Sequence, residues 1–152
     1  MFHELNPDQI DSLLLGQVMG RLACTDGRKP YIFPVTYCYS GKYIYGQTNN
    51  GTKLDMLRQN PEVCFEVDSA MDMNNWQSVI ISGVFEELSQ KEILAARDIL
   101  FNRIFQLMTN SRVHAHEHEV VTEVDDSNRV KEIIYRIEIR EISGRLLSIS
   151  AP

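Results

Sequence analysis

The polar stretch from Gly46 to Lys53 carries the residues best suited to bind an anion. It reads GQTNNGTK and places hydroxyls, amides and one lysine directly before an amphipathic helix, which we expect over residues 52–59. The first N–H groups of a helix lack intrahelical acceptors and lie at the positive end of the helix dipole, so they attract phosphate. The stretch has no Walker-type pattern, and an ordinary surface turn with a solvated lysine fits the same composition. Both interpretations stay open on composition alone.

A second candidate is the alternating run of His114, His116 and His118. In an extended strand these three imidazoles would share one face, and alternate histidines can bind a transition metal. The surrounding residues are polar and show no strong strand pattern, so a polar loop that happens to contain histidines is the other interpretation.

Nucleophilic catalysis has little support, and we assign no catalytic residue. The chain has no G-x-S-x-G elbow, and Cys24, Cys38 and Cys64 lie in apolar, strand-like runs without C-x-x-C spacing. We therefore expect three buried thiols in a reducing compartment, and no disulfide framework or zinc site. Trp76 precedes Gln77 and Ser78, where an indole could belong to the core or flank a planar ligand.

Composition limits the classes of protein that the chain can belong to. Its 152 residues fit a single domain, 1–152, and 43% hydrophobic with 24% charged residues is ordinary for a soluble globular protein. A net charge of −6 argues against nucleic-acid binding, which needs clustered basic residues. No apolar run has the length of a membrane span, and the N-terminus does not resemble a secretory signal. We expect a cytoplasmic protein.

The hydrophobic pattern predicts mostly strands. Asn6 and Pro7 begin a short helix that ends near Gly16, and Ser89 to Glu92 form a capping box at the start of the longest helix. The expected strands cover residues 18–25, 30–39, 43–45, 63–67, 76–88 and 130–142, with a short last segment at 145–148.

Several local features refine these elements. Two of the strands would form a hairpin about Ser40-Gly41-Lys42, and Pro34 places its strand at a sheet edge, at a bulge or beside a partner other than a strand. Residues 68–75 are expected to form a loop, and Ser143-Gly144 a turn. Gly83 marks a bulge or a close approach within its strand. The absence of repeated strand–helix–strand units predicts a mainly β (α+β) fold, an antiparallel barrel with helices packed outside.

The order of these segments resembles a known family. The resemblance rests on the motifs LACTDG, P-x-x-x-P-V, T-x-x-G-x-K-x-x-x-L, N-P-x-V-C-F-x-V and S-V-x-x-x-G, followed by Y-R-I-x-I-x-x-I-S-G-R. Over residues 16–88 and the last strand, the chain resembles the FMN-binding split β-barrel proteins related to pyridoxamine 5′-phosphate oxidase. The branch it resembles includes the nitroimidazole-resistance flavoproteins.

The resemblance implies an antiparallel split β-barrel that forms a homodimer, with two FMN molecules at the subunit interface. By analogy, four residues of one strand would follow the isoalloxazine: Phe33, Pro34, Val35 and Thr36. Five residues would surround the phosphate: Gln47, Thr48, Gly51, Thr52 and Lys53. Three more would contact the flavin, from the same or the second subunit: Trp76, Gln77 and Ser78.

The sequence also departs from the pyridoxamine oxidases proper. Those enzymes carry an arginine in the first flavin-binding strand and a basic pair in the phosphate loop, where this chain has Phe33 and the single Lys53. Oxidation of vitamin B6 is therefore not expected. The favoured function is an FMN-dependent oxidoreductase that reduces a small molecule, with reduced nicotinamide or another reductant as electron donor. The alternatives are a flavin-binding or storage module without turnover, and a haem-binding split barrel that uses a histidine of residues 114–118.

Overall fold

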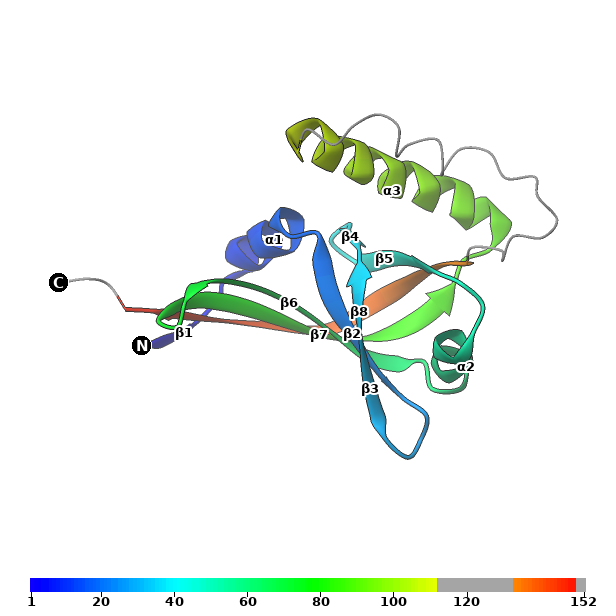
Figure 1. Ribbon diagram of the computed structural model, residues 1–152, viewed down its shortest axis with the longest axis horizontal. Coiled ribbons are helices and arrows are strands. Elements are labelled where there is room, and N and C mark those ends of the chain that lie inside the picture. The colour runs from blue at the N-terminus through cyan, green and yellow to red at the C-terminus, as the bar shows by residue number, and fades with distance from the viewer. Residues whose placement is uncertain (112–132, 150–152) are drawn as a thin grey trace.

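The computed structural model describes residues 1–111 and 133–149 (Figure 1). Three helices are described: α1 (Pro7–Gly16), α2 (Thr52–Gln59) and α3 (Gln90–Ser111). The strands are β1 (Phe2–Glu4), β2 (Met19–Thr25), β3 (Pro30–Thr36), β4 (Cys38–Tyr39), β5 (Tyr43–Thr48), β6 (Glu62–Asp72), β7 (Asn75–Glu87) and β8 (Ile133–Ser148). The histidine run at 114–118 lies outside the described residues.

The strands form one antiparallel sheet that curls into a half-barrel, with the helices packed around it (Figure 1). The order across the sheet is β3-β2-β6-β7-β8-β5-β4, and β1 pairs with the far end of β8. This architecture confirms the predicted antiparallel split barrel with flanking helices. Pro34 lies in β3, which ends the sheet, so the expected edge position is confirmed as well.

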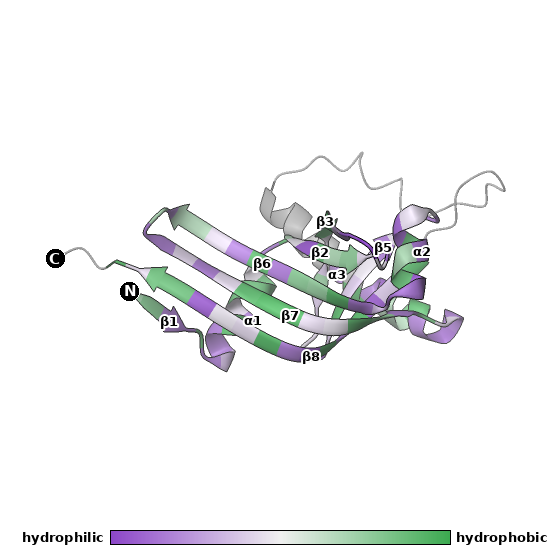
Figure 2. Ribbon diagram, turned by 90° about the horizontal axis from the view of Figure 1, so that it is seen from below, coloured by the Kyte–Doolittle hydropathy of each residue, from purple (hydrophilic) through white to green (hydrophobic). Residues whose placement is uncertain are grey.

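One end of the sheet extends beyond the barrel as a long arm made of β6, β7, β8 and β1 (Figure 2). Two expectations fail here. Residues 68–75 do not form a loop, because Asp68, Ser69 and Ala70 continue the ladder opposite Ser78, Gln77 and Trp76. Ser143-Gly144 is not a turn, because both residues pair with β7 inside the continuous strand β8. Polar composition misled the prediction, since an arm open to solvent accepts polar side chains while its backbone stays paired.

The expected hairpin of residues 30–39 and 43–45 is only partly present, and its second strand, β5, continues to Thr48 into the stretch expected as a loop. The turn at Ser40-Gly41-Lys42 exists, and Gly41 has a φ of 98°, but β4 pairs with β5 over two residues only. The preceding strand β3 pairs with β2 instead. The chain changes partners at Tyr37, whose hydroxyl donates to the buried Leu14 carbonyl at 2.6 Å. This anchor in the core separates β3 from β4.

The side chains on the two faces of the sheet have different neighbours. The core face carries Leu22, Phe33 and Phe65 and packs against the apolar sides of α1 and α2. The outer face carries Arg21, Pro34 and Glu66. Farther along the sheet the outer face is covered by the start of α3, where Ala96 packs with Tyr45 and Ile134.

The helix starts follow the expected capping patterns. Asn6 accepts from the Gln9 backbone N–H at 2.9 Å, and the Gln9 side chain accepts from the Asn6 N–H at the same distance. The Ser89–Glu92 capping box is also present. No helix among the described residues is both long and apolar enough to cross a membrane.

Replacing Arg58 at the end of α2 tests a surface ion pair. Arg58 donates two hydrogen bonds to Glu87, at 2.6 and 3.0 Å, and thereby lowers the pKa of the Glu87 carboxyl below its ordinary 4.5. A lowered carboxyl pKa adds stability above pH 4.5 that is lost as the pH falls through the folded-state pKa. Both side chains are more than a third exposed, so Arg58→Met should cost at most about 1 kcal/mol near neutral pH.

Urea unfolding near neutral pH and near pH 3 measures this cost. The difference between wild type and Arg58→Met should shrink in acid, whereas Arg97→Met, an exposed arginine of α3, should show no such trend. A cost that stays constant across this range would contradict the assignment.

Candidate functional site

Strand β3 lies at the edge of the sheet formed by the described strands. Among these strands it pairs with β2 alone, and the register places Phe33 opposite Leu22, Pro34 opposite Arg21 and Val35 opposite Gly20. Side chains alternate along a strand, so Phe33 and Val35 lie on the core face and Pro34 and Thr36 on the outer face. Val35 is buried, Phe33 is half-buried, and Pro34 and Thr36 are exposed. The predicted segment therefore presents two side chains to each face, and its backbone lies at the sheet edge.

Helix α2 begins with backbone donors that have no side-chain cap. Gly51 is the N-cap and makes no capping hydrogen bond. With no side-chain cap from the described residues, the first N–H groups of the helix can donate to an external acceptor. Thr52 is the first helical residue and is exposed. This geometry suits an anion at the helix start.

Lys53 joins the helix start to the edge strand. Its Nζ lies 5.3 Å from the centroid of the Phe33 ring, and Phe33 stacks in parallel with Tyr31 at 6.4 Å. In the described part of the chain, no carboxylate lies within ion-pair distance of this ammonium group. A cation in the first turn of a helix is electrostatically unfavourable without a nearby anion. The structure thus places Lys53, which was predicted to contact the phosphate, beside Phe33, which was predicted to lie along the isoalloxazine.

The remaining loop residues have different surroundings. Thr48 is buried on the core face, and its hydroxyl donates to the Asn49 carbonyl at 3.3 Å. Gln47 lies on the opposite face of β5 and is exposed. The two side chains therefore point to opposite faces of the strand, and Thr48 already has a local acceptor.

Trp76, Gln77 and Ser78 lie in the arm, away from Lys53. Phe33 of β3 lies in the same row across the sheet as Ile81 of β7, three strand spacings away. Trp76 lies five residues before Ile81 along β7, so the two separations together place Trp76 roughly 20 Å from Phe33. Trp76 packs edge-on against Phe2 at 5.9 Å. Gln77 lies on the core face and lines a polar pocket beside α1, of about 310 Å³. Within one chain this segment does not join the Lys53 region.

A polar cluster on the outer face was not foreseen. Arg21, opposite Pro34, contacts Asp68 at 2.8 Å and Glu66 at 3.7 Å. Ser78 donates to Glu66 at 3.1 Å. Burial raises the pKa of Glu66, and the neighbouring Asp68 adds to the effect. Recognising this cluster requires the strand register, because its members are distant in sequence.

The cysteines only partly match the prediction. Cys24 and Cys38 are buried, but Cys64 is exposed on the outer face, opposite Ala23. Alternation along β6 explains the error, since Val63 and Phe65 take the core positions on either side of it. Burial raises the pKa of the Cys24 thiol, and the Lys53 charge opposes that shift.

Comparison with known proteins decides the family. Residues 6–146 match the family model described as pyridoxamine 5′-phosphate oxidase. The chain belongs to this family. One relative is an uncharacterized protein of Rhizobium meliloti (strain 1021). It is 37% identical to this chain over 70 residues. That stretch spans 46% of this chain and 46% of the relative, so the match covers about half the length of the curated protein.

Solved structures support the family fold over nearly the whole chain. A FAD-binding protein from Mesorhizobium loti is 26% identical with a TM-score of 0.74, and the match covers 97% of this chain and 99% of that one. A candidate 5-nitroimidazole antibiotic resistance protein from Bacteroides thetaiotaomicron VPI-5482 has a TM-score of 0.70 at 17% identity, covering 96% and 87%. At that identity the second match supports the fold alone.

Proposed function

We propose that this chain binds a flavin through its FMN moiety, with the phosphate at the start of α2 and the isoalloxazine along β3. The observation that carries the proposal is Lys53, a cation with no carboxylate partner in the described residues, at the positive end of α2 and over the Phe33 ring. A phosphate there would compensate the ammonium charge and accept from the helix N–H groups. Thr52 supplies a further hydroxyl at the same place.

The edge strand β3 suits the planar isoalloxazine of the flavin. Within residues 1–111 and 133–149, strand β3 pairs along one edge only, and Pro34 contributes no N–H to the other edge. A ring system with polar atoms along one edge could therefore pair with the remaining backbone groups of Phe33 to Thr36. The Mesorhizobium loti protein, similar over almost its entire length, is named as FAD-binding, and FAD contains the same FMN moiety.

A bound flavin would supply hydride or single-electron transfer, and the protein would orient the ring and control access to it. On this basis we favour an oxidoreductase that reduces a small molecule, with reduced nicotinamide or another reductant as donor. Vitamin B6 is a poor candidate substrate, since the expected arginine position holds Phe33 and Lys53 is the single basic residue of the loop. Three free cysteines fit a reducing compartment such as the cytoplasm.

The proposal includes a homodimer, because the arm residues reach the Lys53 region only from a second copy. Trp76 and Ser78 lie on the outer face together with Pro34 and Arg21. The same face exposes large apolar side chains: Ile32 is 67% exposed and Ile80 51%. Apolar surface of this kind favours association with a second copy.

The function is tested by loading the purified protein with FMN and recording its absorbance, its mass in solution and its turnover. We expect flavin bands that co-elute with a dimer, and reduction of an electron acceptor faster than by free FMN. Bound flavin without excess turnover would support the storage module. Absence of flavin uptake would reject the proposal, and a Soret band after adding haem would favour the haem-binding alternative.

A further inference from the structure

The hairpin of β2 and β3 carries a row of cations and aromatic rings, and the flavin assignment uses only one end of it. Lys29 Nζ lies 5.2 Å from the centroid of the Tyr31 ring. Tyr31 is parallel to Phe33 within 5°, with ring centroids 6.4 Å apart. At the far end, Lys53 Nζ lies 5.3 Å from the Phe33 centroid. These contacts link the cation at the turn directly to the proposed phosphate position.

The turn between β2 and β3 is fixed by one carboxylate and presents two cations. Asp26 accepts from the backbone N–H groups of Arg28 at 2.8 Å and of Lys29 at 2.9 Å, and the Tyr31 hydroxyl donates to it at 3.3 Å. The side chains of Arg28 and Lys29 are exposed, and among the described residues neither has a carboxylate within ion-pair distance. Figure 1 shows the hairpin projecting from the sheet beside α2. One negative charge at the turn therefore stands against two accessible positive charges.

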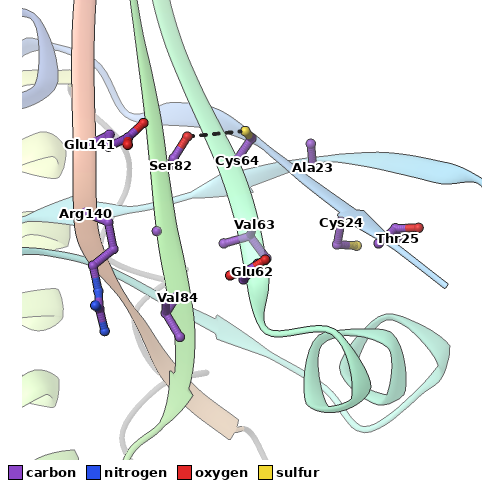
Figure 3. A pocket seen from close by; sticks show the side chains of 11 residues that line it. Ala23, Cys24, Thr25, Glu62, Val63, Cys64, Ser82, Val84, Arg140 and Glu141 are labelled. Atoms are coloured by element: carbon purple, nitrogen blue, oxygen red, sulfur yellow. Dashed lines mark hydrogen bonds between the residues drawn. The ribbon is translucent and has the colours of Figure 1, made fainter. Parts of the chain in front are cut away.

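The outer face beside the hairpin has the opposite electrostatic character. An open pocket of about 510 Å³ there is lined by Glu62 and Glu141 (Figure 3). Arg140 also lines it, as the extra residue of a β-bulge at Gly83, but its Nε lies 3.3 Å from Glu138. With a net charge of −6 the whole chain repels anions. The cations of the turn and of the α2 start are therefore a local exception, and an anionic ligand would bind on their side of the hairpin.

We propose that Arg28 and Lys29 bind the adenosine 2′-phosphate of NADPH, so that the electron donor is NADPH and not NADH. This inference rests on the proposed function, because it names the reductant of the same site. Cations that accept a 2′-phosphate are what separates NADPH from NADH in recognition, and a phosphate monoester binds arginine and lysine by charge-assisted hydrogen bonds.

The hairpin has the length that such a donor requires. Lys29 precedes Phe33 by four residues, roughly 13 Å along an extended chain. A dinucleotide lying beside the flavin can therefore place its nicotinamide near the isoalloxazine and its far phosphate at the turn. NADPH gives up one hydride and leaves as NADP⁺, and a proton from solvent completes the two-electron reduction of the flavin.

Calorimetric titration of FMN-loaded protein with 2′,5′-ADP and with AMP tests the inference, since FMN already fills the Lys53 position. We expect 2′,5′-ADP to bind about tenfold or more tightly than AMP, as one charge-assisted contact to the 2′-phosphate would provide. The KM for NADPH should be lower than that for NADH by a similar factor. Lys29→Met should abolish most of both preferences and leave FMN affinity unchanged, and Lys29→Arg should retain them. Lys91→Met, which removes an exposed lysine at the start of α3, should change neither.

The outcomes separate the two proposals. Equal binding of 2′,5′-ADP and AMP, or binding of neither, would overturn the 2′-phosphate site and leave flavin binding intact. A preference for 2′,5′-ADP that survives in both Lys29→Met and Arg28→Met would overturn it too. A loss of FMN affinity in Lys29→Met would assign the turn to the flavin and likewise overturn the inference. Failure of the protein to take up FMN would reject the proposed function itself.

Discussion

Replacing Lys53 by methionine is expected to weaken FMN binding by about 10–100-fold, the loss of one charge-assisted contact to phosphate. Methionine keeps most of the side-chain length and removes the ammonium group that lies 5.3 Å from the centroid of the Phe33 ring, so the change removes the charge selectively. The fold should not suffer, because a cation in the first turn of α2 opposes the helix dipole. Fluorescence titration of apoprotein measures the affinity, and thermal unfolding without flavin checks the stability.

Lys42→Met is the matched control for Lys53→Met. Lys42 is exposed in the turn between β4 and β5, and its backbone carbonyl accepts a hydrogen bond from the Ile139 N–H at 3.0 Å, which a side-chain substitution leaves in place. FMN affinity should be unchanged in this variant. Equal affinities in wild type and Lys53→Met, or an equal loss in both variants, would remove Lys53 from the phosphate site.

Replacing Gly83 by alanine is expected to destabilise the fold by about 1–3 kcal/mol, as overpacking of a tight contact does. A Cβ at this position would lie 2.5 Å from the Glu138 carbonyl oxygen and 2.6 Å from the Ile137 Cγ2. The first of these atoms is backbone, so relief requires β7 and β8 to move apart at the bulge. Urea unfolding followed by circular dichroism measures the change in the free energy of unfolding.

Gly16→Ala is the control for Gly83→Ala. A Cβ at Gly16, the last residue of α1, meets no atom within 4 Å. Stability should be unchanged or raised by up to about 1 kcal/mol, because alanine favours the helix. If Gly83→Ala were as stable as Gly16→Ala, the close approach of β8 to Gly83 would be wrong.

The fold was largely predictable because local signals agreed with it. Asn6-Pro7, Ser89-Glu92, Pro34 and Gly83 each predicted a cap, an edge or a bulge that the structure confirms. The failures are non-local. Residues 68–75 look like a loop in isolation, and only their pairing with β7 makes them a strand. Tyr37 separates β3 from β4 through a hydrogen bond to α1 that no local pattern reveals.

The candidate site was predictable where local composition indicates binding, and not where it depends on contacts between distant segments. The Lys53 loop has a local composition that indicates an anion, whereas its contact with Phe33 depends on how α2 packs beside β3. Gln77 was grouped with Trp76 and Ser78, yet strand alternation sends its side chain to the other face. Arg140 and Cys64 line a pocket set by register and by the separation of β2 from β6, which sequence spacing does not encode.

The central claim is that the start of α2 holds the phosphate of a flavin. Titration of the apoprotein with FMN and with riboflavin, which lacks the phosphate, tests it most directly. The account predicts that FMN binds about tenfold or more tightly than riboflavin and that this advantage is lost in Lys53→Met. Equal binding of FMN and riboflavin by the wild-type protein, or binding of neither, would contradict it.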